Sequence, residues 1–398
     1  MEPALNPYSP GSGRRPPELV GRSRELESFD TLRARVANHR TDRGLVLTGL
    51  RGVGKTVLLN EMHRMAEDFD WLTVRLEARR EETGARAVRR NLARDLVVAA
   101  RKYTRTRLSA RMRAALGTIS AFNAKIGATS IELGVELNHG RGDSGDVEVD
   151  LVELVQDVAA ALGEQGRAFA VFIDEMQDLD GETLGALIAA QHAANQRDLP
   201  FYIVGAGLPN LPRVLTETRS YAERLFDYRS IGQLDRTESA RALAEPAERL
   251  GATYAPAALD VLLDAAGGYP YFLQEYGQAA WSVAADRSIS EDDARAAVEY
   301  GTEQLDGGFF RSRWSRATRS ERRMLAAMAA DGEGPSATGP VAERMQLKPK
   351  SLGPYRAALI QKGLVYAPEH GQVAFTVPGM AAFVHRHRED SEAFDETD

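Results

Sequence analysis

The segment "GLRGVGKT", at residues 49–56, combines a glycine-rich turn with a lysine and a threonine, and is called the phosphate loop below. Its glycines allow a tight turn whose N–H groups point at phosphate oxygens. They are Gly49, Gly52 and Gly54. Lys55 can reach the β and γ phosphates, and the hydroxyl of Thr56 can ligate Mg²⁺. The spacing therefore predicts a site for ATP with Mg²⁺.

A second group of chemically useful residues follows the apolar run in "FAVFIDEMQDL", at 169–179. Such a run is typical of a central parallel strand, which places Asp174 and Glu175 at the carboxyl edge of a sheet, where ligands bind. Asp174 would hold Mg²⁺ through water, and Glu175 would orient or deprotonate the attacking water. The alternative is an acidic cap on the next helix, a role that Asp178 or Asp180 could also fill.

The elements that must position these residues alternate along the chain. "GLVLT" (44–48) is expected to be a buried strand, and the stretch after the loop has the apolar spacing of a helix. Further strands are expected at 71–78, 200–207 and 226–234, and helices at 83–102, 151–163 and 181–196. Alternating strands and helices predict an α/β fold with the parallel sheet of a P-loop NTPase.

Three further stretches resemble the AAA+ superfamily, in its branch with origin-recognition initiators, archaeal-type ATPases and STAND signalling ATPases. "LVGRSRELESF" (19–29) resembles the branch's N-terminal motif, which implies that Val20 and Gly21 lie near the adenine. "GGYP" resembles the lid signature and implies that Pro270 contacts the nucleotide. The resemblance covers residues 18–306 and implies a helical lid over 237–306.

The third stretch, "SYAERLF" (220–226), lies where AAA+ proteins place an arginine finger, which implies that Arg224 acts on a neighbouring subunit of a homo-oligomer. Arg224 could instead pair with Glu223 on a helix surface, and Arg219 is a rival for the finger. Two departures from the family favour slow hydrolysis, as in a switch. The usual polar sensor after strand 200–207 is not obvious, with Asn210 the nearest residue, and Pro270 stands where many lids carry an arginine.

The core contains an apparent insertion at 104–149. A basic helix is expected at 101–117, and the alternation of apolar residues within 122–146 predicts a β-hairpin with a polar tip. The hairpin could contact a partner or nucleic acid, or simply extend over the core.

The C-terminal part has a different rhythm. Three helices are expected at 318–329, 339–346 and 351–363, followed by strands at 364–368 and 372–378, an order that resembles a winged helix-turn-helix. Thr318 and Glu321 predict a capping box at the first helix. The third helix would enter the major groove of DNA. The expected DNA contacts are Lys348, Lys350, Ser351, Tyr355 and Arg356.

Charge supports this interpretation. Residues 311–365 contain eleven Lys/Arg and four Asp/Glu, a net charge of +7, whereas the whole chain carries −7, so the rest carries −14. Phosphate neutralisation supplies most non-specific DNA affinity. Winged helices also pack against proteins, so a partner-recruiting switch without DNA binding remains the alternative.

The expected domains are a flexible tail at 1–17, the ATPase core at 18–236, the lid at 237–306, the winged-helix domain at 307–388 and an acidic tail at 389–398. The 398 residues contain no cysteine, which excludes disulfides, thiolate zinc sites and cysteine nucleophiles. The sequence has neither a membrane-length apolar run nor a signal peptide, so a cytoplasmic protein is expected. It predicts an ATPase whose nucleotide state controls DNA binding; a small-molecule kinase would leave the C-terminal domain unexplained.

Overall fold

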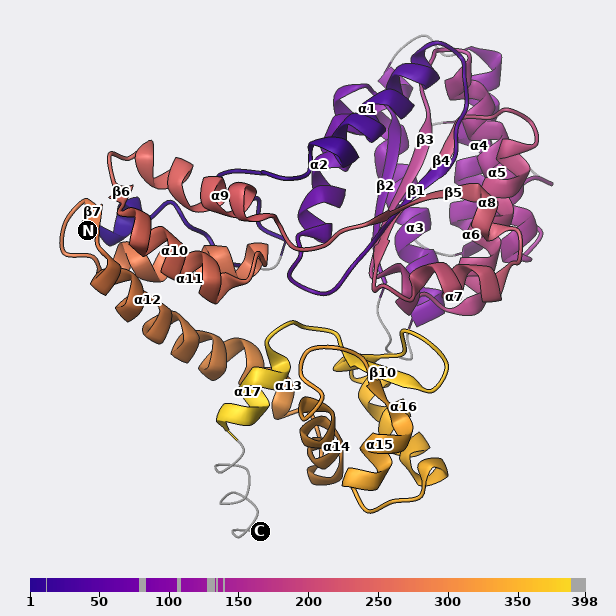
Figure 1. The fold of residues 1–398 in the computed structure, drawn as a ribbon. Coiled ribbons are helices and arrows are strands. Elements are labelled where there is room, and N and C mark those ends of the chain that lie inside the picture. Colours follow the sequence, from indigo (N-terminus) through magenta and orange to yellow (C-terminus); the bar gives the residue numbers. More distant parts are fainter. Residues whose placement is uncertain are drawn as a thin grey trace.

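The computed structural model describes residues 1–11, 13–78, 84–105, 109–126, 133, 135–138 and 140–387. Figure 1 shows an α/β core, a layer of helices beside it, and a third region that lies below both. The expected acidic tail at 389–398 lies outside the described residues.

The core is built on one parallel sheet of five strands in the order β2-β3-β4-β1-β5. The strands are β1 Gly44–Thr48, β2 Leu72–Glu77, β3 Phe169–Asp174, β4 Phe201–Gly207 and β5 Phe226–Ser230. Every residue of β1, β3 and β4 is buried, as their continuous apolar sequences predict. The expected α/β fold with a parallel sheet is confirmed, although the last strand ends at Ser230.

Helices cover both faces of this sheet, as Figure 1 shows. α1 Ser23–Ala37 and α2 Lys55–Asp68 pack on one face in a core that includes Phe29, Leu58 and Phe172. The other face is covered by α3 Gly84–Ala100, α4 Ala110–Ile126, α5 Val147–Gly163 and α6 Gly181–Asn195. Shorter helical elements are η2 Arg101–Arg105, η3 Met176–Asp178, α7 Leu211–Thr218 and α8 Ala222–Leu225.

The insertion differs from expectation where it is described. The expected basic helix is two elements, η2 and α4, and α4 buries Met112, Leu116 and Phe122 in the core. Residues 122–126, expected to begin a hairpin, are the last residues of α4, and the described residues between 133 and 146 contain no strand. The remaining hairpin positions, 127–132, 134 and 139, lie outside the described residues. A short alternation of apolar residues fits one face of a helix end equally well.

The lid contains α9 Arg236–Glu248, α10 Pro256–Ala266, α11 Pro270–Val283 and α12 Glu291–Gln304, with a two-residue pairing of β6 Thr253–Tyr254 and β7 Ser288–Ile289. Gly268 has φ +75°, and a Cβ there would lie 2.4 Å from the carbonyl oxygen of Leu234. The "GGYP" turn therefore depends on glycine for both its backbone conformation and its close approach to the chain that enters the lid.

The N-terminal segment, residues 1–17, was expected to be a flexible tail, and this expectation is wrong for the described residues. It contains a short helix, η1 Pro3–Leu5, and packs along the lid in Figure 1. Tyr8 is 3% exposed, and the amino terminus donates a hydrogen bond of 2.8 Å to the carbonyl oxygen of Ala284. The segment is ordered by tertiary contacts rather than by a core of its own.

The lid joins the C-terminal domain through continuous helix. α12 passes into the π-helical turn η4 Leu305–Phe310 and then into α13 Arg311–Trp314. Gly307 and Gly308 lie inside this turn. Asp306 is buried there and pairs with Arg386 at 2.6 Å, which fixes the turn against the last helix, α17 Met380–Arg386.

The C-terminal domain contains α14 Arg319–Ala329, β8 Ser336–Ala337, α15 Thr338–Arg344, η5 Pro349–Leu352, α16 Gly353–Gln361, β9 Val365–Tyr366 and β10 Gln372–Phe375, followed by α17. Its strands form an antiparallel sheet in the order β8-β10-β9. The expected capping box of Thr318 and Glu321 is present. β8 was not expected, because two residues paired through their backbone leave no periodic signal in the sequence.

Candidate nucleotide site

The phosphate loop joins β1 to the amino terminus of α2. Gly52 and Gly54 have φ values of +85° and +91°, a region that glycine enters without steric cost. α2 begins at Lys55, so its free N–H groups and dipole face the loop and favour an anion. The ammonium group of Lys55 donates a hydrogen bond of 2.8 Å to the carbonyl oxygen of Leu50, across the loop.

The other glycines that the sequence singled out shape the backbone around this loop. A Cβ on Gly49 would lie 2.2 Å from the carbonyl oxygen of Ile231, and a Cβ on Gly21 would lie 2.4 Å from a carboxylate oxygen of Glu238. Next to Gly21, the buried Arg22 donates hydrogen bonds of 3.0 Å to Val53 and 2.7 Å to Gly232. The N-terminal motif therefore braces the loop.

The two acids at the end of β3 lie beside the loop. The Thr56 hydroxyl donates a hydrogen bond of 2.8 Å to Asp174 Oδ2, so a hydroxyl and a carboxylate converge, and oxygens are the ligands that Mg²⁺ prefers. Glu175 caps no helix through its side chain, whereas Asp180 caps α6 by accepting from the Thr183 N–H at 2.9 Å. The structure thus assigns the capping role to Asp180.

The carboxylate of Glu175 contacts two neighbouring side chains. Gln177 donates a hydrogen bond of 2.6 Å to Glu175 Oε2, and Arg51 Nη2 lies 3.2 Å from Oε1. Gln177 also accepts a hydrogen bond of 3.1 Å from the Leu208 N–H, just after β4. Glu175 itself has φ +49°, uncommon for a residue other than glycine, Asn or Asp. Backbone and side chain together aim this carboxylate at the end of the phosphate loop.

Burial shifts the pKa values of two charged side chains at the loop, Lys55 and Asp174. Desolvation lowers the pKa of Lys55 to about 8, although Glu175 and Asp174 act to raise it. Desolvation also raises the pKa of Asp174 above its ordinary value, against the hydrogen bond from Thr56. Lys55 is therefore mostly protonated at neutral pH, but it loses its proton more readily than an exposed lysine does.

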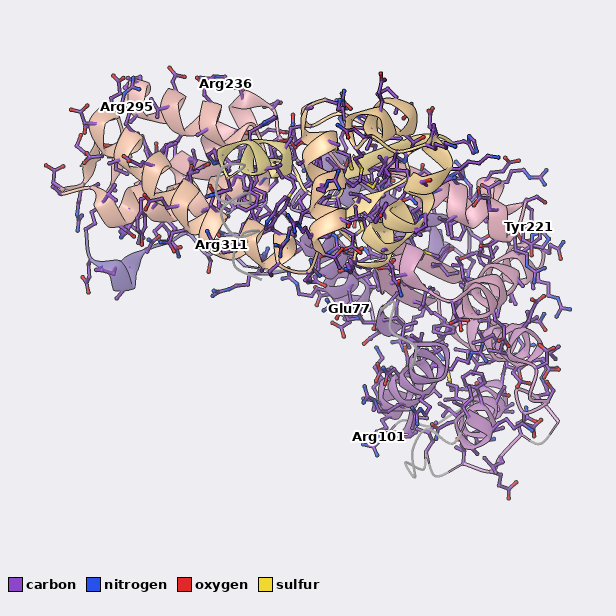
Figure 2. The ribbon with its side chains drawn as sticks, turned by 90° about the horizontal axis from the view of Figure 1, so that it is seen from below. Glu77, Arg101, Tyr221, Arg236, Arg295 and Arg311 are labelled. Carbon is purple, nitrogen blue, oxygen red and sulfur yellow. The ribbon has the colours of Figure 1, made fainter. Side chains whose placement is uncertain are left out.

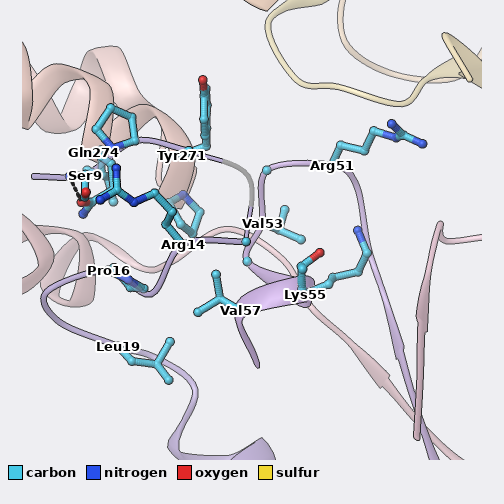
Figure 3. Close-up of a pocket in the computed structure, with 18 of the residues that line it drawn as sticks. Ser9, Arg14, Pro16, Leu19, Arg51, Val53, Lys55, Val57, Tyr271 and Gln274 are labelled. Atoms are coloured by element: carbon cyan, nitrogen blue, oxygen red, sulfur yellow. Dashed lines mark hydrogen bonds between the residues drawn. The ribbon is translucent and has the colours of Figure 1, made fainter. Parts of the chain in front are cut away.

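A cavity of about 320 Å³ lies over the loop, and Figure 3 shows its lining. Among the residues expected to bind nucleotide or metal, seven line it: Val20, Gly52, Gly54, Lys55, Thr56, Asp174 and Pro270. The expected catalytic Glu175 lines it as well, whereas Gly21 and Gly49 do not.

Several lining residues were not expected. The N-terminal segment contributes Arg14 and Pro16, and its Ser9 N–H donates a hydrogen bond of 3.2 Å to Gln274 of the lid (Figure 3). Helix α13, between the lid and the C-terminal domain, contributes Arg313. Neither has a local motif, because tertiary folding alone brings these distant segments to the cavity.

The C-terminal domain contacts the phosphate loop directly. The Arg51 N–H donates a hydrogen bond of 2.9 Å to the carbonyl oxygen of Thr376, just after β10. A small apolar cluster seals this contact and consists of Leu50, Leu208, Tyr366 and Ala374. On the lid side, the Tyr271 N–H donates a hydrogen bond of 3.3 Å to Gly52. Two other domains therefore touch the same short loop.

Arg224 does not reach the cavity of its own chain. It is exposed on α8, before β5, and β5 runs parallel to β1 with Phe226 opposite Gly44. α8 therefore lies at the amino edge of the sheet, about 17 Å of strand away from the loop. Figure 2 places Tyr221, which precedes α8, on the far side of the molecule from Arg236 and Arg295 of the lid. The rival, Arg219, pairs with Glu148.

The expected DNA contacts lie around the start of α16. Lys348, Lys350 and Ser351 are exposed, and within the described residues neither lysine forms an ion pair. Tyr355 and Arg356 are half-buried, and Arg356 donates a hydrogen bond of 3.4 Å to Gln372 of β10. Part of the positive charge in this region is neutralised, because Lys362 pairs with Glu321 at 2.6 Å and Arg344 pairs with Asp331.

Residues 18–204 match the family model described as an AAA ATPase domain, a span that includes the phosphate loop and both acids of β3. This segment of the chain therefore resembles an AAA-type P-loop domain. A second family model, described as a domain of unknown function (DUF8462), matches residues 307–384. No curated protein sequence matches the chain.

Solved structures resemble this chain over nearly its whole length. A Walker-type ATPase of Pyrococcus abyssi is 15% identical with a TM-score of 0.58, and the alignment covers 96% of this chain and 99% of that one. The Thermotoga maritima RuvB variant R170A is 14% identical with a TM-score of 0.47, covering 93% and 95%. Aeropyrum pernix Orc1 in complex with DNA is 14% identical with a TM-score of 0.44, covering 95% of each chain. At these identities the first likeness shows the fold alone, and the two lower scores support no argument.

None of the helices in the described residues is both long and apolar enough for a membrane span. No cluster of three or more His, Asp or Glu side chains suited to a metal occurs among the same residues. A Mg²⁺ ion held mainly by phosphates and water, with one or two protein oxygens, needs no such cluster.

The low pKa of Lys55 makes ATP affinity dependent on pH. The protonated ammonium is the form that attracts phosphate, and in the free protein it is lost as pH rises through about 8. We expect affinity for a non-hydrolysable ATP analogue to fall above that pH, by up to about tenfold per pH unit. Calorimetry over a pH series measures this. Lys55→Arg keeps its charge throughout and should show a flat profile; a flat wild-type profile would contradict the prediction.

Proposed function

We propose that the chain binds and slowly hydrolyses ATP with Mg²⁺, and that its nucleotide state controls the C-terminal domain. The observation that carries this proposal is the hydrogen bond from the Arg51 N–H, inside the phosphate loop, to Thr376 of that domain. Nucleotide that reshapes the loop must also alter this contact. A switch therefore fits the geometry better than an ATPase core that works apart from its appended domain.

The roles within the site follow from the contacts described above. Lys55 and the loop N–H groups bind the phosphates, and Thr56 and Asp174 would hold Mg²⁺. That ion would supply Lewis-acid stabilisation of phosphate charge. Glu175 orients or deprotonates the attacking water, and Val20 and Pro270, which line the cavity, contact the adenine base.

We assign the C-terminal domain as a winged helix that binds DNA. Its order of α14, β8, α15, α16, β9 and β10, with a three-stranded antiparallel sheet, supports the winged-helix assignment. The exposed Lys348 and Lys350 precede α16, where they can reach phosphates while the helix enters the major groove. Docking on the ATPase core occupies Tyr366, Ala367 and Thr376, not the start of α16.

The second candidate is a switch that recruits a protein partner without DNA. Ion pairs within the C-terminal domain, such as Lys362 with Glu321, favour it because they reduce the charge left for phosphates. The two candidates differ in one measurable property, which is the salt dependence of binding to a duplex of mixed sequence.

The test is DNA affinity from about 50 to 200 mM salt, with a non-hydrolysable ATP analogue, with ADP and without nucleotide. If the domain binds DNA through several phosphates, the logarithm of the affinity should fall linearly with the logarithm of the salt concentration, with a slope of about −0.9 for each phosphate contact. The affinity should also depend on which nucleotide is bound. Replacing Lys348 and Lys350 by Ala should reduce the magnitude of this slope by the contribution of about two phosphate contacts. Arg43→Ala, which removes an exposed cation just before β1 and outside both candidate DNA-contact regions, is the control. An absence of binding at low salt would favour the protein partner.

A further inference from the structure

The junction between the lid and the C-terminal domain places a cation over the nucleotide cavity. Arg313, on α13, lines the same cavity as Arg51, Lys55 and Glu175. The lid lines this cavity with Pro270, Tyr271, Leu273 and Gln274, among other residues, but with no arginine. Among the described lining residues, the cation that approaches from the C-terminal side is therefore Arg313.

Its surroundings within the described residues do not neutralise it. The guanidinium lies 3.9 Å from the centre of the Phe309 ring and donates a hydrogen bond of 2.6 Å to the carbonyl oxygen of Phe309. No carboxylate there forms an ion pair with Arg313, whereas Arg51 pairs with Glu175 at 3.2 Å. Burial, with Arg51 and Arg316 nearby, lowers the pKa of Arg313 to about 10. A partly buried cation among other cations is unfavourable until an anion joins it.

We propose that Arg313 binds the terminal phosphate of ATP held in its own chain, so that the C-terminal domain detects ATP directly. The proposal rests on the proposed function of the cavity, because the anion is the part of ATP that ADP lacks. A guanidinium is suited to this role, since its planar fork donates two parallel hydrogen bonds to phosphate oxygens.

The elements around Arg313 can carry this signal. Phe309 stacks on Tyr271 of the lid with ring centres 4.8 Å apart, and Phe310 stacks on Phe383 of α17 at 5.3 Å. Both phenylalanines belong to the π-helical turn η4, a type of turn that often marks functional sites. A phosphate that draws Arg313 inward therefore acts on a packed joint between the lid and the C-terminal domain.

The test compares affinities for a non-hydrolysable ATP analogue and for ADP, by calorimetry on the full chain. Arg313→Met keeps the length and packing over Phe309 but removes the charge. We expect it to weaken binding of the ATP analogue roughly 10- to 100-fold, while ADP affinity changes little. Arg313→Lys retains the charge without the planar fork and should recover part of the loss.

Arg311→Ala is the matched control, because Arg311 is exposed on the same short helix (labelled in Figure 2) and does not line the cavity. It should leave both affinities unchanged. The proposal would be overturned if Arg313→Met weakened the binding of both nucleotides equally, or if it changed neither affinity. If free inorganic phosphate binds beside ADP in the wild type and Arg313→Met removes that binding, Arg313 belongs to a free-phosphate site, which would also overturn the proposal. Failure of the wild-type chain to bind either nucleotide would refute the proposed function itself, which separates the two outcomes.

Discussion

Replacing Glu175 by Gln should leave ATP binding intact and lower the hydrolysis rate by about 10²–10⁴-fold. The amide keeps the shape of the side chain. Its oxygen can still accept a hydrogen bond from Gln177, which in the native protein donates a hydrogen bond of 2.6 Å to Glu175 Oε2. It loses the basicity needed to accept a proton from water, and it loses the ionic attraction to Arg51. Single-turnover hydrolysis and calorimetry on the same sample measure the two properties separately.

The matched control is Glu182→Gln, which removes a carboxylate that pairs with Arg89 at 2.7 Å near the start of α6. It should leave the hydrolysis rate unchanged, because that carboxylate does not line the cavity. Turnover of Glu175→Gln at the wild-type rate would mean that another group positions the water. That group would not be Asp174, because Asp174 already accepts a hydrogen bond from Thr56.

The sequence predicted the parts of this site that are local. β1 and β3 are continuous apolar runs buried on both sides, and the phosphate loop and the Asp174-Glu175 pair follow them directly, so strand and chemistry are read from one stretch. The sheet order could not be read in this way. It follows from which strands pair across the core, as β1 does with both β4 and β5.

The N-terminal segment shows why composition failed elsewhere. Its proline and glycine content predicts a chain that cannot build a core, and it builds none. It is ordered because Tyr8 enters the lid and the Trp281 indole donates a hydrogen bond of 2.9 Å to Glu2. Arg313 is a similar case. Nothing near it in the sequence marks a phosphate ligand, and only the docking of the junction against the loop brings it to the cavity.

Hydrolysis should require a neighbouring subunit, because Arg224 lies at the edge of the sheet opposite the phosphate loop of its own chain. It makes no ion pair within the described part of the chain and is exposed, so it is available to a partner. A trans-acting arginine contributes about 10³–10⁵ in rate. Turnover per chain should therefore rise with protein concentration, and Arg224→Ala should abolish that rise with little loss of ATP affinity.

Mixing two inactive variants decides whether this arginine acts in trans. Lys55→Ala chains cannot bind the phosphates, and Arg224→Ala chains cannot stabilise the transition state, so each is inactive alone. Where they meet, a Lys55→Ala chain can donate its arginine to the intact loop of an Arg224→Ala chain, and activity should return. Arg219→Ala is the matched comparison, because Arg219 pairs with Glu148 of its own chain and should be dispensable for turnover. No recovery on mixing, together with concentration-independent turnover of the wild type, would show that each chain works as a monomer.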